Sequence, residues 1–146
     1  MSLPKPQAGL VICYSYLWRS EYLRGQEEGV KDRPCAIVLS TFADEDGGAS
    51  VIVVPVTHTP PADIAAAIEM PVGIKQHLGL DADRSWIILS ESNEFDWPGP
   101  DLRRIGSRDD GSVAYGMLPP RFFLELRRRF LALEDAAASR RVRRTE

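Results

Sequence analysis

The fold is decided by residues 31–57, KDRPCAIVLSTFADEDGGASVIVVPVT. Two runs of branched apolar residues, CAIVLST and SVIVVPVT, flank the segment ADEDGGA, which is rich in Asp and Gly. Apolar runs of this length around such a turn predict two β-strands joined as an antiparallel hairpin. Their near-continuous apolar character indicates burial on both faces, or the tight interior of a small barrel.

The rest of the chain also favours short strands with irregular links. We expect strands in residues 10–18, 68–72, 85–91 and around 113–116, loops over 19–32 and 93–101, and one helical turn in IKQHLGL. This order is not the alternating pattern of βαβ units. It predicts a mainly β (α+β) protein, a small barrel with helical cover.

The last helix has the clearest pattern. Leu118-Pro119-Pro120 marks its start, and an apolar stripe follows at Phe122, Phe123, Leu126, Phe130 and Leu133. Residues 136–146, AAASRRVRRTE, are too polar to pack by themselves. We therefore expect one domain over residues 1–135 and a flexible Arg-rich tail over 136–146.

Composition limits the class of protein. The chain has 146 residues, 44% of them hydrophobic, and a net charge of -3, which argues against a protein that coats nucleic acid by bulk charge. Of its 18 basic residues 15 are Arg, whose planar fork suits phosphates and carboxylates. No signal peptide or membrane span is evident, so we expect a soluble, cytoplasmic protein. Cys13 and Cys35 lie in apolar runs and are expected to be buried free thiols.

Several kinds of site can be set aside. Neither GxGxxG nor GxxxxGK[ST] occurs, and His58 and His77 have no cysteine partners at zinc-site spacing. Carboxylates gather near one loop at Glu91, Glu94, Asp96 and Asp101, where either a metal site or a solvated strand end is open. Our prediction includes no metal and no cofactor.

Arg33 and Thr57 are the strongest candidates for chemistry. Pro34 keeps the backbone before the second strand extended, and Thr57 ends the third strand. From Asp46 in the turn, Arg33 lies thirteen residues back and Thr57 eleven forward, so an antiparallel hairpin brings them to the same end. A guanidinium and a hydroxyl together suit a phosphodiester, since both donate hydrogen bonds to its oxygens.

A purely structural role is the alternative. Arg33 would then cap the strand end by pairing with Asp32 or Glu28, and Thr57 would be an ordinary β-branched strand residue.

These motifs carry a family resemblance. Gly9 with its following strand, the loop segment GQEEG, then KDRPCAIVLS and VIVVPVT resemble the MazF/PemK toxins of bacterial toxin-antitoxin modules. The resemblance implies a small SH3-like barrel (CcdB/MazF/PemK type) with a C-terminal helix, and a homodimer restrained by a cognate antitoxin. It further implies metal-independent cleavage of single-stranded RNA through attack by the RNA's own 2′-hydroxyl, with Arg33 and Thr57 as the catalytic residues.

The chain also departs from that family. Asp32 stands where many members have Gly, and it either holds Arg33 or weakens its attraction for RNA. The segment SWIILSESNEF replaces a more usual Asp-Gln ending, so the resemblance implies no base contacts from that edge. Lys31, Glu28 in the loop and Trp97 are further candidates for contact with RNA. Trp97 would stack on a base, or else lie buried at a dimer contact or under the Pro-rich loop.

The departures keep a second function open. On the same barrel, the chain would be a non-catalytic toxin or binding protein, either gyrase-directed or nuclease-inactive, neutralised by an antitoxin. An unrelated barrel that carries these short motifs by accident is the third alternative.

Overall fold

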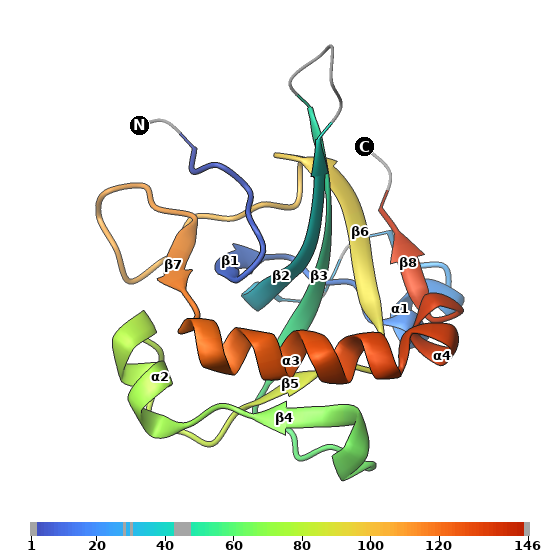
Figure 1. Ribbon diagram of the computed structural model, residues 1–146. Coiled ribbons are helices and arrows are strands. Elements are labelled where there is room, and N and C mark those ends of the chain that lie inside the picture. The colour runs from blue at the N-terminus through green and yellow to red at the C-terminus, as the bar shows by residue number, and fades with distance from the viewer. Residues whose placement is uncertain (1–2, 28, 30, 43–47, 145–146) are drawn as a thin grey trace.

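The computed structural model describes residues 3–27, 29, 31–42 and 48–144. In these residues the protein is mainly β, with eight strands and several helices, which makes it an α+β protein as predicted (Figure 1). None of the described helices has both the length and the apolar character needed to cross a membrane.

The predicted hairpin forms the centre of the sheet. Strands β2 (Arg33–Phe42) and β3 (Ala49–Thr57) pair antiparallel, with Cys35 opposite Pro55. Both are buried on two faces, because alternate side chains belong to different apolar clusters. Ala36, Val38 and Val54 lie in one cluster, and Cys35, Ile37 and Val53 lie in the other. The prediction of burial on both faces is confirmed.

The other strands extend the sheet from this hairpin. They are β1 (Leu10–Tyr14), β4 (Ala67–Glu69), β5 (Trp86–Ile88), β6 (Ser92–Trp97), β7 (Ala114–Met117) and β8 (Arg141–Arg143). Beyond β2 lie β1 and then β7, while on the far side of β3 strand β6 pairs with its first half and β5 with its last two residues. The path β4-β5-β3-β2-β1-β7 has two ends that do not pair with each other within the described residues, so the sheet is open.

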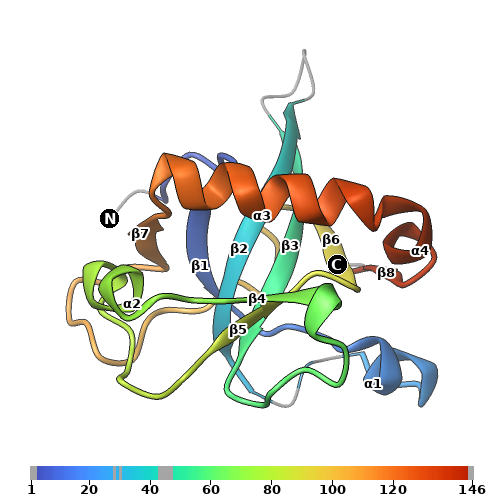
Figure 2. The same cartoon turned by 60° about the horizontal axis from the view of Figure 1, so that its bottom comes forward.

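Helix α3 (Pro120–Ala132) covers one face of the sheet, crossing β1, β2, β3 and β6 in Figure 2. Its stripe packs as predicted, with Leu126 and Phe130 fully buried and Phe122, Phe123 and Leu133 partly buried against the same cluster. The shorter helices lie at the sheet's margins and are α1 (Arg19–Leu23), the 3-10 helix η1 (Ile64–Ala66), α2 (Val72–Leu78) and α4 (Glu134–Ala138).

The prediction of a loop over residues 93–101 is wrong for its first half. Residues 92–97 form strand β6 against β3. Polar residues concealed this strand, because Ser92 and Asn93 are fully buried although neither is apolar. The Asn93 side chain accepts a hydrogen bond from Leu17 N at 2.9 Å and donates one to Leu17 O at 2.8 Å, which replaces its lost contacts with water.

The prediction of a flexible tail from residue 136 is also wrong. Strand β8 pairs in parallel with β6, Val142 is 2% exposed and Arg144 is 5% exposed. The arginines that made this segment look too polar to pack have acidic partners: Arg144 with Asp101, and Arg141 with Glu134. A polar segment can therefore pack when each charge meets a partner.

Four smaller predictions also need correction. The strand expected over 10–18 ends at Tyr14. Helix α1 occupies the start of the loop expected over 19–32, and the Glu21 carboxylate caps its first turn by accepting a hydrogen bond from Trp18 N at 3.0 Å. The strand expected over 68–72 is residues 67–69, and α2 starts after Pro71. The strand expected over 85–91 is limited to residues 86–88. Cys13 and Cys35 are buried and free, as predicted.

Candidate functional site

The hairpin brings Arg33 and Thr57 to one end of the sheet. Cys35 lies opposite Pro55 in the antiparallel register, and two residues further along each strand Arg33 and Thr57 line the same two hollows. Tyr14 flanks Arg33 on the far side, and Trp86 flanks Thr57. The predicted convergence of the two residues is confirmed.

Two hollows meet at this pair. The first, called here the Arg33 cavity, measures about 310 Å³ and is lined by Lys31, Arg33, Thr57, Lys75, Asp81 and Tyr115, among others. The second, called here the Trp18 groove, measures about 380 Å³ and is lined by Trp18, Arg33, Thr57, His58, Pro60 and Ile88, among others. Each volume lies in the range of small-ligand sites. Arg33 and Thr57 line both hollows.

The Arg33 guanidinium is held mainly by uncharged groups. Its Nη1 donates to the main-chain oxygen of Val56 at 3.3 Å, and its central carbon lies 5.0 Å from the centre of the Trp18 ring. Its Nε is buried without a hydrogen-bond partner among the described residues, and no described carboxylate pairs with the side chain. An Arg with unused donors beside a cavity can bind an anion such as a phosphate.

Trp18 is a site residue that sequence reasoning missed. It lies at the end of the strand expected over residues 10–18. The signal that could have identified it is the position of a Trp directly before a polar loop. Stacking of a guanidinium on an indole is favourable by about 0.5–2 kcal/mol and orients the cation. Trp18 therefore fixes where the Arg33 charge lies.

On the other wall, three side chains form a connected polar chain. Lys75 is 4% exposed and donates from Nζ to Asp81 Oδ1 at 2.7 Å, to Ser85 Oγ at 2.7 Å and to the main-chain oxygen of Asp83. Asp81 Oδ2 meets His58 Nε2 at 2.8 Å. The hydrogen bond from Lys75 lowers the pKa of Asp81, so this carboxyl group stays ionised. Neither Lys75 nor Asp81 has a distinctive signal in the sequence.

Thr57 keeps a hydrogen to donate. Its Oγ1 accepts from the main-chain nitrogen of Thr59 at 3.2 Å, which fixes the side chain, while a hydroxyl that accepts can still donate.

The described residues contain one group with spacing suited to a metal. Ligand atoms of His58, Asp81 and Asp83 lie within 4.8 Å of one another, and all three residues are exposed. The Lys75 ammonium already binds Asp81 and the Asp83 carbonyl, so a divalent ion placed there would meet a like charge. We assign no metal to these residues.

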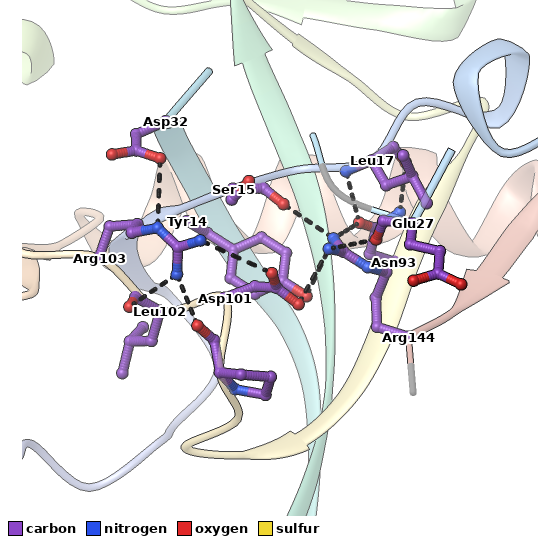
Figure 3. Close-up of polar contacts among 11 residues, drawn as sticks. Tyr14, Ser15, Leu17, Glu27, Asp32, Asn93, Asp101, Leu102, Arg103 and Arg144 are labelled. Carbon is purple, nitrogen blue, oxygen red and sulfur yellow. Dashed lines mark hydrogen bonds and ion pairs between the residues drawn. The ribbon is translucent and has the colours of Figure 1, made fainter. Parts of the chain in front are cut away.

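Asp32 pairs with another arginine rather than with Arg33. Its Oδ1 lies 3.6 Å from Arg103 Nε, and Arg103 Nη2 lies 3.8 Å from Asp101 Oδ1 (Figure 3). Asp101 in turn meets the buried Arg144 at 2.9 Å. This row of alternating charges connects the rim of the Arg33 cavity to the C-terminal segment. Asp32 is therefore paired with Arg103, and it forms no ion pair with Arg33 among the described residues.

The remaining candidates are placed differently. Lys31 is exposed and lines both hollows. Trp97 pairs with Ala49, eight residues before Thr57, so it lies about 26 Å from the site along β3 and packs against Phe95. Trp97 therefore does not contribute to this site within one chain. Glu28 lies outside the described residues.

Comparisons with protein-family models, with curated proteins and with solved structures returned no match for this chain.

Proposed function

We propose that the protein is a sequence-selective, metal-independent endoribonuclease that cleaves single-stranded RNA, and the toxin of a type II toxin-antitoxin module. The observation that carries the proposal is the meeting of Arg33 and Thr57 at two hollows, with the guanidinium free of any described carboxylate. The resemblance of KDRPCAIVLS and VIVVPVT to MazF/PemK toxins supports the same reaction.

In this reaction the RNA supplies its own nucleophile. The 2′-oxygen attacks the adjacent phosphorus, the bond from phosphorus to the 5′-oxygen breaks, and the products are a 2′,3′-cyclic phosphate and a 5′-hydroxyl. Charge builds on the non-bridging oxygens in the transition state. Arg33 donates to those oxygens and neutralises them, and the Thr57 hydroxyl donates one further hydrogen bond.

The assembly is part of the proposal. The open sheet is then a distorted member of the SH3-like barrels, the working form is a cytoplasmic homodimer, and a cognate antitoxin restrains it. The alternative, a non-catalytic toxin or binding protein on the same fold, predicts binding to gyrase or to an antitoxin peptide without RNA cleavage.

The test is RNA cleavage by the purified protein with and without EDTA. We expect a mixed single-stranded RNA pool to be cut equally in both conditions, with 5′-hydroxyl and 2′,3′-cyclic phosphate ends. A substrate carrying a 2′-deoxynucleotide at the cut position should resist cleavage. Thr57→Val, which keeps the shape of the side chain, should lower kcat by about 10- to 10²-fold if one hydrogen bond of about 1.5–3 kcal/mol to a charged phosphate oxygen is lost.

Three outcomes would contradict the proposal: an intact RNA pool, cleavage that requires a metal, or cleavage of the deoxy substrate. Thr41→Val is the matched control for Thr57→Val, because Thr41 lies on the same hairpin outside both hollows.

A separate prediction concerns Asp32. Asp32→Asn should leave kcat unchanged and lower KM for RNA about two- to fivefold, because a half-exposed negative charge is removed from the rim and Arg103 is released. The gain should shrink as salt is raised from 50 to 200 mM, which initial-rate measurements will show. A loss of kcat would instead mean that Asp32 helps to hold the catalytic side chains.

A further inference from the structure

The proposed reaction needs a proton acceptor that Arg33 and Thr57 do not provide. Attack by the 2′-oxygen requires removal of its proton, and the departing 5′-oxygen must gain one. A guanidinium is permanently protonated at physiological pH, and a threonine hydroxyl is a very weak base. If the proposed function holds, on which this inference rests, another group near the two hollows must accept the proton.

His58 is placed to do so. It follows Thr57 directly at the end of β3, and it lines both the Arg33 cavity and the Trp18 groove. Its side chain is 54% exposed, so an RNA strand in either hollow can reach the ring. Nε2 is engaged by Asp81 at 2.8 Å, and among the described residues Nδ1 makes no hydrogen bond.

The partner of Nε2 determines which nitrogen can act. Lys75 holds Asp81 as a carboxylate, and a carboxylate can only accept a hydrogen bond. The shared hydrogen of the 2.8 Å contact must then sit on Nε2. In the neutral ring the other nitrogen, Nδ1, carries a lone pair. Asp81 thus prepares the tautomer that accepts a proton at Nδ1, as a carboxylate orients the base in other nucleophile-and-base pairs.

Lys75 keeps Asp81 in position. All three hydrogens of its ammonium group are used, by Asp81, Ser85 and the Asp83 carbonyl, and the group is nearly inaccessible to water. The main-chain nitrogen of Asp83 also donates to Asp81 Oδ1 at 3.1 Å. The carboxylate is therefore held from one side and has a single oxygen, Oδ2, free for His58.

We propose that His58 is the general base of the cleavage reaction and that Asp81 and Lys75 are positioning residues that act through it. The proton of the 2′-hydroxyl passes to His58 Nδ1 as the 2′-oxygen bonds to phosphorus. The bond to the 5′-oxygen then breaks, and that oxygen takes a proton from water. The imidazolium then releases the proton it gained to solvent, so the charge of the protein is unchanged over the reaction. Arg33 and Thr57 hold the phosphate throughout.

Other titratable groups face the imidazole from every neighbouring element, and a pH profile must be interpreted with them in mind. They lie in the segment before β2, in β2, in α2, after α2 and in β7, and are Lys31, Asp32, Arg33, Lys75, Asp81 and Tyr115.

The test replaces His58 and compares pH profiles. We expect His58→Gln to lower kcat about 10²- to 10⁴-fold with little change in KM, and to remove the acid-side decline of kcat that a general base produces. In His58→Ala, added imidazole should restore part of the rate. His77→Gln is the matched control, because His77 is exposed on α2 and lines neither hollow.

The positioning role of Asp81 has its own readout. Asp81→Asn lets the side-chain amide donate to Nε2 and so favours the wrong tautomer, and we expect a loss of kcat with KM unchanged. Because both residues act in one unit, adding Asp81→Asn to His58→Gln should cause no further loss.

The outcomes separate this inference from the proposed function. If the wild-type protein leaves RNA intact, the proposed function fails. If the wild type cleaves, Arg33→Ala does not, and His58→Gln cleaves as fast as His77→Gln with an unchanged pH profile, then this inference alone is overturned. Thermal melting of each variant checks that the exposed substitution leaves the fold intact.

Discussion

Arg33→Ala is expected to lower kcat for RNA cleavage by about 10²- to 10³-fold. Removal of one preorganised donor to a developing oxyanion costs that much in other enzymes, and Arg33 additionally supplies a full positive charge. Arg33→Lys should recover only part of the loss, because an ammonium lacks the planar fork and stacks less well on Trp18. Single-turnover cleavage of a defined RNA measures both variants.

Arg84→Ala is the matched control for this experiment. Arg84 also lies 5.0 Å from the centre of a Trp ring, that of Trp86, but it pairs with Glu69 on the surface and lines neither hollow. Arg84→Ala removes the same type of side chain as Arg33→Ala and the same kind of contact with a Trp ring. Equal rates for Arg33→Ala and the wild-type protein would refute the catalytic assignment, and equal losses in Arg33→Ala and Arg84→Ala would attribute the effect to net charge.

Arg144→Ala should have the largest effect on stability, about 3 kcal/mol lost from the free energy of unfolding. Removing one member of a buried ion pair costs about 3–5 kcal/mol, because the other charge is left without compensation. The lower end applies here, since Arg103 lies 3.8 Å from Asp101 and compensates part of its charge. Arg144 also donates from Nη1 to Ser15 O at 2.8 Å and to Asn93 Oδ1 at 3.1 Å, contacts that join three segments (Figure 3).

Urea titration of Arg144→Ala measures this effect against Arg143→Ala. The neighbouring Arg143 is 47% exposed and pairs with Asp96 at the surface, where such pairs contribute about 0–1 kcal/mol. An unchanged midpoint for Arg144→Ala would mean that the C-terminal segment does not stabilise the domain. The row of charges from Arg144 through Asp101 and Arg103 ends at Asp32, on the rim of the Arg33 cavity. We therefore also expect Arg144→Ala to raise KM for RNA by a larger factor than it lowers kcat.

The success of the hairpin prediction and the failure at β6 have the same physical cause. Residues 35–41 and 50–57 bury apolar side chains, whose preference for the interior is visible in any context. Residues 92–97 instead bury Asn93, whose burial is favourable only because Leu17 and Arg144 supply hydrogen bonds. Those partners lie at least fifty residues away, so no local pattern indicates them.

The candidate site likewise has residues that local sequence could place and residues that it could not. Arg33 and Thr57 could be placed together by counting along one hairpin, because the pairing of adjacent strands is a local property. Trp18, Lys75 and Asp81 reach the site from other elements, and nothing in their local sequence relates them to residues 33 and 57. His58 directly follows Thr57, but no motif in the sequence assigns it a role.

By itself, then, the sequence determined the two-faced hairpin, the amphipathic helix α3 and the meeting of Arg33 with Thr57, because each depends on apolar periodicity or on strand pairing between neighbours. Only the tertiary structure decided that Trp18 supports Arg33, that Asp32 pairs with Arg103, and that Lys75 and Asp81 orient His58. It also decided that the arginine-rich C-terminus packs. Polar contacts of this kind depend on partners brought close by folding, and a charged residue alone does not indicate which partner it will meet.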